Sequence, residues 1–526
     1  MSVIFRSRWR LSIPIALILL ALIVSLVYTL ASRGFTHAAT QAASEPLVQI
    51  SSDPFHNKIS QHKTEVEPDT FAFGDTVVSA FQVGRVFNGG AADIGFATST
   101  NGGETFIHGF LPGLTAVSTP PGPYIRTSDA AVAYDLKHNV WLISELGLFP
   151  GGNTSEVDVL VSRSTDGGRT WSSPVAVNAT GHFNDKNWTV CDDTPTSPFF
   201  GRCYTEFDNA SDGDRIQMST STDGGLTWGP ARETANHDFG IGGQPLVQPG
   251  GTVIVPIVGF TISVNQPFNQ KSFISTDGGA SWSATVIVSR DPIHVPQGIR
   301  ATIPLPSAEI DASGKVYSVW QDCRFEKGCP FNDLVLSTST DGLHWTAPKL
   351  VPIDPIGSHR DHFIPGLAVD RTTSGSSAHL ALAFYFYGFP GFSTGNCQTN
   401  DCVLRVGFID STNGGQSWSN KEVLTQPMFL QWLALTTQGY MVGDYISTSI
   451  IPGDNDAFPA FAVATPPTNV PPQGGTCNSS GVVCHESIFT TPEDLLEITG
   501  GTNVAGNAPT FFPTTGPSLK TPPTAF

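Results

Sequence analysis

The sequence predicts an all-β protein built from a repeated four-stranded antiparallel unit. The 526-residue chain has only 14% charged residues but 53 glycines and 40 prolines, a composition typical of strands joined by turns. One short motif recurs six times along the chain. An apolar strand leads into each copy, and two further strand-like segments lie ahead of it. Repeats of this period indicate an array or a ring of similar units.

The chain begins with a predicted membrane helix. Residues 11–31 contain no charged side chain and are long enough to span a bilayer. Arginines precede the run, so the positive-inside rule keeps the N-terminus in the cytoplasm and exports the rest. We predict an uncleaved anchor over residues 1–33, with a cleaved signal peptide as the alternative. The expected location is therefore the cell membrane, single-pass with the C-terminal body outside, or the secreted fraction if the signal is cleaved.

The eight cysteines support export. They fall in four close pairs: Cys191 with Cys203, Cys323 with Cys329, Cys397 with Cys402, and Cys477 with Cys484. Even parity and local spacing favour four short-range disulfides in an oxidising compartment. Zinc-type CxxC spacing is absent from the sequence, and we predict neither a metal nor a cofactor. The net charge of −18 argues against a nucleic-acid partner.

The recurring motif has a structural interpretation. The copy at Ser164–Trp171 reads Ser-Thr-Asp-Gly-Gly-Arg-Thr-Trp. Asp or Asn followed by Gly favours a tight hairpin turn, and the Ser and Asp side chains can bond the turn's own backbone. The closing aromatic residue is expected to pack into the sheet. The acidic or amide positions of the six copies are Asn101, Asp166, Asp223, Asp277, Asp341 and Asn413. We expect these residues to build the fold and not to act in catalysis.

Each motif lies between the third and fourth strands of a predicted four-stranded meander. The first two strands of the six units are expected at 70–73 and 76–82, 130–134 and 140–144, 188–191 and 202–207, 244–248 and 252–257, 307–310 and 315–320, and 364–369 and 379–385. Four-stranded units repeated radially make a β-propeller.

A further set of strands, without the motif, is expected at the C-terminal end, at 441–451, 457–464 and 486–490. This set lacks a fourth strand, which residues 47–51 can supply by joining the two ends of the chain. We therefore favour seven blades over six plus an appendage. The predicted order is a linker at 34–45, the propeller at 46–497 and a disordered Pro/Thr-rich tail at 498–526.

The motif resembles the Asp-box, or BNR repeat, of the sialidase superfamily. With the flanking strands, the resemblance covers about residues 64–490. It implies a propeller whose boxes lie away from the catalytic face. Members of this group include sialidases, other glycoside hydrolases, binding modules and assembly factors, so the resemblance leaves the activity open.

The resemblance also implies a set of site residues at the mouth of the central channel. Sialidases bind the substrate carboxylate with three arginines and use an Asp as acid/base and a Tyr–Glu pair as nucleophile. The residues assigned to substrate binding are Arg126, Arg300, Arg360, His362 and Asp444. The residues assigned to catalysis are Tyr445 as nucleophile, Glu67 (or Glu65) as its partner, and Asp185 or Asp361 as acid/base.

Two functions follow as expectations. The first is an exported, membrane-anchored, sialidase-like exo-glycosidase that acts on an extracellular glycan or glycoconjugate, with exo-α-sialidase as the finer expectation. The second is a non-catalytic propeller at the cell surface that binds glycans or proteins through the same face. A protein-interaction scaffold in the cell envelope is a third alternative.

Overall fold

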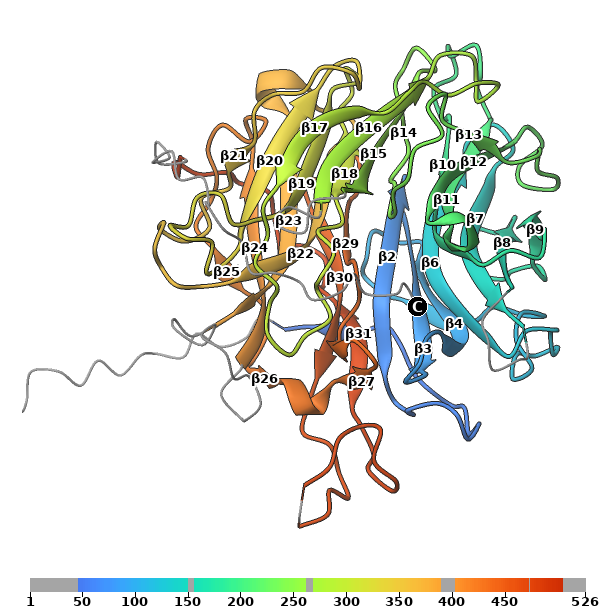
Figure 1. Ribbon diagram of the computed structural model, residues 1–526, viewed down its shortest axis with the longest axis vertical. Helices are drawn as coiled ribbons and strands as arrows, with labels where there is room; N and C mark the ends of the chain where they lie inside the picture. The colour runs from blue at the N-terminus through green and yellow to red at the C-terminus, as the bar shows by residue number, and fades with distance from the viewer. Residues whose placement is uncertain (1–45, 150–155, 262–267, 389–402, 473, 505–526) are drawn as a thin grey trace, which may run out of the picture. The chain divides into compact units, whose positions relative to one another are not determined.

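The computed structural model describes residues 46–149, 156–261, 268–388, 403–472 and 474–504. All of these belong to one compact unit, Ser44–Phe526 (Figure 1). The predicted anchor (1–33) and linker (34–45) lie outside the described residues. Within the described part of the chain, no helix has the length and apolar character needed to cross a membrane.

The fold is an all-β propeller of antiparallel meanders. The strands of the first two meanders are β2 (Glu65–Phe73), β3 (Thr76–Arg85), β4 (Ala91–Ser99), β5 (Ile107–Phe110), β6 (Arg126–Asp135), β7 (Val140–Leu148), β8 (Val157–Ser164) and β9 (Val175–Asn178). The next two contain β10 (Asn184–Cys191), β11 (Cys203–Asn209), β12 (Arg215–Ser221), β13 (Arg232–Glu233), β14 (Leu246–Val247), β15 (Val253–Phe260), β16 (Phe268–Ser275) and β17 (Val286–Asp291).

The second half of the chain repeats the pattern. It contains β18 (Ser307–Ile310), β19 (Val316–Asp322), β20 (Asp333–Ser339), β21 (Lys349–Leu350), β22 (His362–Val369), β23 (Leu380–Tyr387), β24 (Val403–Ser411), β25 (Glu422–Val423), β26 (Met428–Phe429), β29 (Ser447–Ile450), β30 (Ala457–Ala464) and β31 (Glu486–Thr490). The hairpin of β27 (Ala434–Thr436) and β28 (Gly439–Met441) stands apart, and three short 3-10 helices, η1 (Ala210–Asp212), η2 (Gly375–Ser377) and η3 (Leu430–Trp432), connect strands.

The hydrogen bonding corrects the predicted number of blades. Five sheets are separate blades: four have four strands, and the β22–β25 sheet gains β26 as a fifth. The first eight meander strands instead form one eight-stranded sheet, joined by the single pair Ala91↔Thr127 between β4 and β6. Seven or six separate blades are therefore not observed. The physical cause is Arg126, which donates to Asn88 and to the Gly89 carbonyl and so holds the β3–β4 turn against the start of β6.

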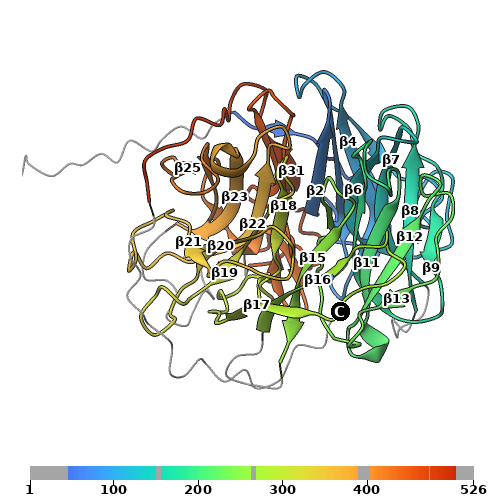
Figure 2. The same cartoon turned by 90° about the horizontal axis from the view of Figure 1, so that it is seen from above.

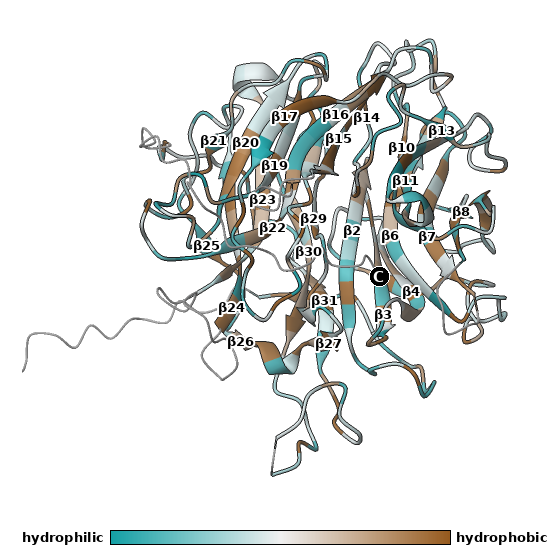
Figure 3. Ribbon diagram, in the orientation of Figure 1, coloured by the Kyte–Doolittle hydropathy of each residue, from teal (hydrophilic) through white to brown (hydrophobic). Residues whose placement is uncertain are grey.

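The innermost strands surround a common centre (Figure 2). Contacts run in chain order through β2, β6, β10, β14, β18, β22 and β29, and β29 in turn contacts β2. The ends of the chain close this ring as predicted, because β1 (Val48–Gln49) pairs with β31. The strand β2 carries both hydrophilic and hydrophobic segments where it faces the centre (Figure 3).

The six motifs form the predicted turns. In the second copy, Ser164 donates to Asp166 at 2.8 Å and accepts from the Gly168 N–H, while the N–H and hydroxyl of Thr170 both donate to Asp166. Burial acts to raise the pKa of Asp166, but these hydrogen bonds outweigh it and lower that pKa to about 2. These carboxylates are therefore satisfied within their own turns, as the sequence predicted.

The first residues of the predicted tail, 498–504, belong to the folded unit. Residues 498–504 are described, and Asn503 exchanges two backbone hydrogen bonds with Trp418 of the last motif. The backbone N–H of Gly500 also donates to Asp410. This segment is therefore part of the folded unit, because it satisfies backbone groups of the final turn. Residues 505–526 lie outside the described residues.

Candidate functional site at one mouth of the central channel

A hollow of about 930 Å³, open solvent included, lies where several innermost strands begin. Its charged lining comes from the end of β3, from β6 and β10, and from two loops: Arg85, Asp129, Asp185, Lys186, Arg300 and Asp444. Glycines at 89 and 90 and apolar side chains such as Leu146 and Ile303 complete the wall. A concave site with a few convergent polar groups is the usual form of a ligand pocket.

A repeated irregularity of the backbone positions the charged side chains. The pairing register shifts between Val66 and Asp69 in β2, between Ser128 and Ala131 in β6, and between Asp185 and Trp188 in β10. At each shift one residue has a positive φ, namely Glu67 (60°), Asp129 (51°) and Lys186 (50°). Such values are uncommon for residues other than glycine, and β-bulges re-aim side chains next to functional sites. Three adjacent strands thus direct a charged group toward the same mouth of the channel.

Arg300 and Asp444 form the central ion pair of the site. The guanidinium of Arg300 donates to both carboxylate oxygens of Asp444, with 2.7 Å between Nε and Oδ1. The N–H of Asp444 donates to Glu67 at 3.0 Å, and the Gln82 amide donates to the other oxygen of Glu67. Burial acts to raise the pKa of Asp444, but Arg300 overcomes it and holds that pKa below its usual range. Burial, with Asp129 and Asp444 nearby, raises the pKa of Glu67.

Asp129 and Asp185 form a carboxyl pair in the pocket wall. Both line the pocket, and they are close enough for each to influence the pKa of the other. Burial raises the pKa of both, that of Asp185 to about 6, although Arg300 and Lys186 act in the opposite direction. Two carboxyl groups in contact hold a shared proton more readily than two negative charges. This pair can therefore donate or accept a proton near neutral pH.

Lys186 and Tyr445 stack below the pocket. The ammonium of Lys186 lies 3.3 Å from the ring centroid of Tyr445, and no hydrogen-bond acceptor for it is found among the described residues. The Tyr445 hydroxyl donates to the carbonyl of Ala130 at 3.0 Å, and the side chain is only 4% exposed. Burial raises the pKa of Tyr445 well above its usual value. Glu67 is near but does not accept from this hydroxyl, since its oxygens take the Asp444 N–H and the Gln82 amide.

The other predicted residues lie in a second group outside the pocket lining. Asp361 accepts from the backbone and side-chain N–H groups of Asn332, and its second oxygen lies 3.6 Å from His294. His362 contacts Asp354 at 3.0 Å, and the Arg360 side chain lies 3.9 Å from the same carboxylate. Arg126, Arg300 and Arg360 therefore have three different partners: the β3–β4 turn, Asp444 and Asp354.

The structure thus brings together four of the predicted residues, Glu67, Asp185, Asp444 and Arg300, with Tyr445 beneath them. The sequence places Arg85, Asp129 and Lys186 in polar segments at the same channel mouth, but sequence reasoning assigned none of them a role. The available signal was the recurrence of a charged residue within the first few positions of the innermost strand in three successive units. Glu65, the alternative to Glu67, is buried and accepts from Ser51 instead.

Three of the four predicted disulfides are present: Cys191–Cys203, Cys323–Cys329 and Cys477–Cys484. The fourth predicted disulfide, between Cys397 and Cys402, is not among those observed, because both Cys397 and Cys402 lie outside the described residues. The pairing of Cys397 with Cys402 therefore stays a prediction.

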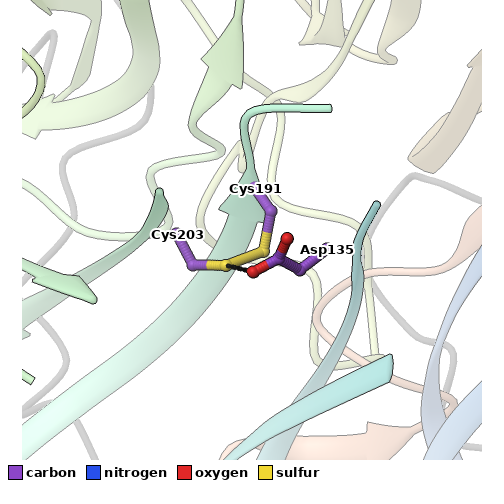
Figure 4. Close-up of side chains that lie close together, drawn as sticks. All are labelled: Asp135, Cys191 and Cys203. Atoms are coloured by element: carbon purple, nitrogen blue, oxygen red, sulfur yellow. Dashed lines mark hydrogen bonds between the residues drawn. A yellow bond between two sulfur atoms is a disulfide. The ribbon is translucent and has the colours of Figure 1, made fainter. Parts of the chain in front are cut away.

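A metal site is not supported by the one cluster of potential ligands that the described residues contain. This cluster consists of Asp135 with Cys191 and Cys203 (Figure 4). Because these two cysteines are joined by a disulfide, they offer no thiolate to a metal.

Comparison with known proteins adds one family match. Residues 148–358 match the family model described as a BNR repeat-like domain. This match covers the second to fifth motifs. This part of the β-propeller is a BNR repeat-like domain. No curated protein sequence matches the chain.

Solved structures resemble this BNR-repeat propeller only distantly. The Hadza microbial sialidase Hz136 shares 14% identity, with 83% of this chain and 67% of that chain covered and a TM-score of 0.41. A PL25 ulvan lyase shares 11% identity, with 85% and 96% covered and a TM-score of 0.47. The intramolecular trans-sialidase of Ruminococcus gnavus shares 13%, with 85% and 98% covered and a TM-score of 0.40. At these values the likenesses carry no argument about activity.

Proposed function

We propose that this BNR-repeat propeller acts on glycans and cleaves a glycosidic bond at the channel mouth. The observation that carries the proposal is the Asp129–Asp185 carboxyl pair in a pocket that also contains the cations of Arg85 and Lys186. Cleavage of a glycosidic bond needs an acid near the leaving oxygen and negative charge near the developing oxocarbenium ion. The paired carboxyl groups meet the first need, and Asp444, whose pKa Arg300 holds low, supplies negative charge beside them.

Each side chain then has a role. Asp185, its proton shared with Asp129, protonates the leaving oxygen. Arg85 and Lys186 bind acidic or hydroxyl groups of the sugar. Arg300 is already held by Asp444 in two bonds, so it orients that carboxylate. In the alternative, sialidase-type assignment, Tyr445 is the nucleophile, Glu67 its base, Asp361 the acid, and Arg126, Arg300, Arg360 and His362 the substrate ligands.

We also propose that the eight-stranded sheet counts as two blades, which gives a ring of seven repeat units. The support is that β2 and β6 are both innermost strands, each with its own three outer partners. We further propose export of the propeller, supported by its disulfides, with attachment to the cell membrane through residues 1–33.

The test is turnover by the purified full-length protein on a panel of fluorogenic glycosides that includes an α-sialoside and a uronic-acid glycoside. We expect release of the fluorophore from at least one substrate and a loss of about a hundredfold in Asp185→Asn. The matched control is Asp223→Asn in a motif turn, because two other motifs already carry Asn at this position. Turnover that persists in Asp185→Asn contradicts the assigned acid.

The non-catalytic alternative rests on a specific observation. Arg300, Asp444 and Tyr445 have their hydrogen bonds satisfied by protein groups, as in a preorganised cradle. No turnover on any substrate, together with binding to a glycan array that Lys186→Ala removes, would favour a glycan-binding propeller. If the protein shows no turnover and also binds no glycan, both proposals are contradicted.

A further inference from the structure

A second pair of buried carboxyl groups lies directly behind the pocket. Asp208 in β11 is the cross-strand partner of Asp185 in β10. Directly opposed residues of an antiparallel pair have Cβ atoms about 5 Å apart on the same face of the sheet. The carboxyl group of Asp214, in the turn that follows η1, is close enough to that of Asp208 for each group to influence the pKa of the other. The carboxyl groups thus follow one another from Asp129 through Asp185 and Asp208 to Asp214.

Asp208 is unusual because its carboxyl group has so few partners. Its side chain is fully buried, at 0% exposure. Apart from the nearby Asp214 carboxyl group, no donor among the described residues forms a hydrogen bond with either oxygen of Asp208. An ionised carboxylate left in this state is very costly, so the group carries a proton. Burial, with Asp185, Asp214 and Glu206 nearby, raises the pKa of Asp208 well above its usual value.

Asp214 is the last of these four carboxyl groups and lies near solvent. It is half-buried, in contrast to Asp208, and its φ of 64° belongs to the turn between β11 and β12. The turn is fixed by backbone hydrogen bonds from Asp214 N–H to Asn209 and from Gly240 N–H to Asp214. A carboxyl group held in this position can exchange protons with water on one side and with Asp208 on the other.

We propose that Asp208 and Asp214 are positioning residues that form a proton pathway between solvent and the Asp129–Asp185 pair. This proposal rests on the proposed function. When Asp185 gives its proton to the leaving oxygen, the Asp129–Asp185 pair gains one negative charge. Asp208 returns a proton to Asp185, Asp214 returns one to Asp208, and water returns one to Asp214. The water that replaces the leaving group on the sugar carbon loses one proton to solvent at the channel mouth. Each carboxyl group ends in its starting state, and the proton that moves inward along the pathway balances the one released.

The other charged groups around this pathway are few and can be named. Lys186 and Arg300 face Asp185 from β10 and from the loop before β18, and both favour its ionised form. Glu206 faces Asp208 from the same strand and favours its protonated form. Asp444 and Glu67 lie beyond Asp129 on the far side of the pocket. These charges favour the ionised form of Asp185 and the protonated form of Asp208. Transfer from Asp208 to Asp185 is therefore uphill, and it requires Asp214 to reprotonate Asp208 as the proton leaves.

A bound cation is the competing explanation for two carboxyl groups in contact. Hard divalent cations need several oxygen ligands around one point. Among the described residues, Asp185, Asp208 and Asp214 do not bring three ligand atoms into one such group. A shared proton satisfies the pair Asp208–Asp214 without further ligands.

The experiment compares Asp208→Asn and Asp214→Asn with Glu145→Gln, which changes a fully buried carboxyl group outside the pocket. We expect each Asp variant to lose about tenfold in turnover in dilute buffer, and to recover activity when a small weak acid such as formic acid is added. Glu145→Gln should need no rescue. A variant that merely distorts the site would not respond to the added acid. Unchanged turnover in both Asp variants, without added acid, overturns the proposal.

A second measurement does not depend on turnover. The infrared absorption of protonated carboxyl groups is recorded on the folded protein without substrate, at neutral pH. We expect Asp208→Asn to remove part of this band, even if no glycan is cleaved and the proposed function fails. The opposite result, no change in the band, overturns the proposal. So does a calcium-dependent rise in Tm that Asp208→Asn abolishes, because the pair would then hold a cation.

Discussion

The motif turns and the channel mouth use the same residue type in opposite ways. Asp166 lies in an exposed turn and accepts hydrogen bonds from Ser164 and Thr170, and its pKa is lowered to about 2. Asp185 is buried beside another carboxyl group, and its pKa is raised to about 6. The sign of the shift follows from the donors that surround each carboxylate. An Asp surrounded by donors stabilises a turn, whereas an Asp buried beside another acid exchanges its proton closer to neutral pH.

The largest expected effect tests the paired charges of the channel mouth. Arg300→Ala leaves the Asp444 carboxylate without its bidentate partner, and the free energy of unfolding should fall by about 3 kcal/mol or more. Arg169→Ala is the matched control, because Arg169 is exposed on a motif turn and should change stability by less than about 0.5 kcal/mol. Chemical denaturation measures both. Equal losses of unfolding free energy in Arg300→Ala and Arg169→Ala would contradict the contrast between the channel mouth and the motif turns.

The second prediction tests how tightly the motif turns pack. Gly167 and Gly168 both have a φ of +77°. A Cβ at Gly168 would lie 2.8 Å from the Val78 side chain, whereas at Gly167 its nearest neighbours are 3.9 Å away. Gly168→Ala should cost about 2–3 kcal/mol, from backbone strain and overpacking, and Gly167→Ala only about 1 kcal/mol, from strain. Thermal denaturation of the two variants gives the comparison, and a larger loss at Gly167 would contradict it.

The third prediction separates turn stability from activity. Asp166→Ala removes the acceptor for the Thr170 N–H and hydroxyl and for Ser164, so stability should fall by about 1–2 kcal/mol. Turnover per folded molecule should stay unchanged, because the turn does not line the pocket. Asp166→Asn should lose less, since Asn occupies this position in two motifs. Loss of turnover without loss of stability would show that the turn belongs to the site.

The smallest effect concerns pH. Burial raises the pKa of Asp361 from 3.8 to about 8. The folded state therefore binds more protons than the unfolded chain, and this group's contribution to stability is lost as pH rises from about 4 through about 8. Asp361→Asn should remove this loss, so the stability of the variant should fall less than that of the parent protein between about pH 5 and about pH 8. The measurement is the Tm of Asp361→Asn, of the parent protein and of the control Asp223→Asn at the two pH values. If the Tm of Asp361→Asn changes with pH as much as that of the parent protein, the prediction is contradicted.

Local chemistry explains which parts could be predicted from the sequence. The turn of each motif depends on residues within eight positions, such as Ser164, Asp166 and Gly168, so the motif alone predicted its hydrogen bonds. The disulfide Cys191–Cys203 was also predictable, since its cysteines end one strand and begin the next. The strand that closes the ring at Val48–Gln49 was predicted in another way, from the fourth strand that the last unit lacks.

The site required information that no local pattern holds. Arg360 and His362 are close in sequence to Asp361, yet they bind Asp354 instead of joining Arg300. Asp129 and Lys186 reach the pocket because bulges with positive φ re-aim them, and the sequence does not mark a bulge. The fusion of the first two units likewise depends on Arg126 reaching the Gly89 carbonyl 37 residues away in the chain.

The sequence by itself determined that this chain forms repeated four-stranded meanders with self-satisfied turns, because strand pattern and turn chemistry act over a few residues. Only the tertiary structure decided which charged residues meet at the channel mouth and which of them keep a proton. The physical reason is that a pKa depends on burial and on neighbours from other strands. For Asp185 those neighbours are Asp129 and Arg300, contributed by distant parts of the chain.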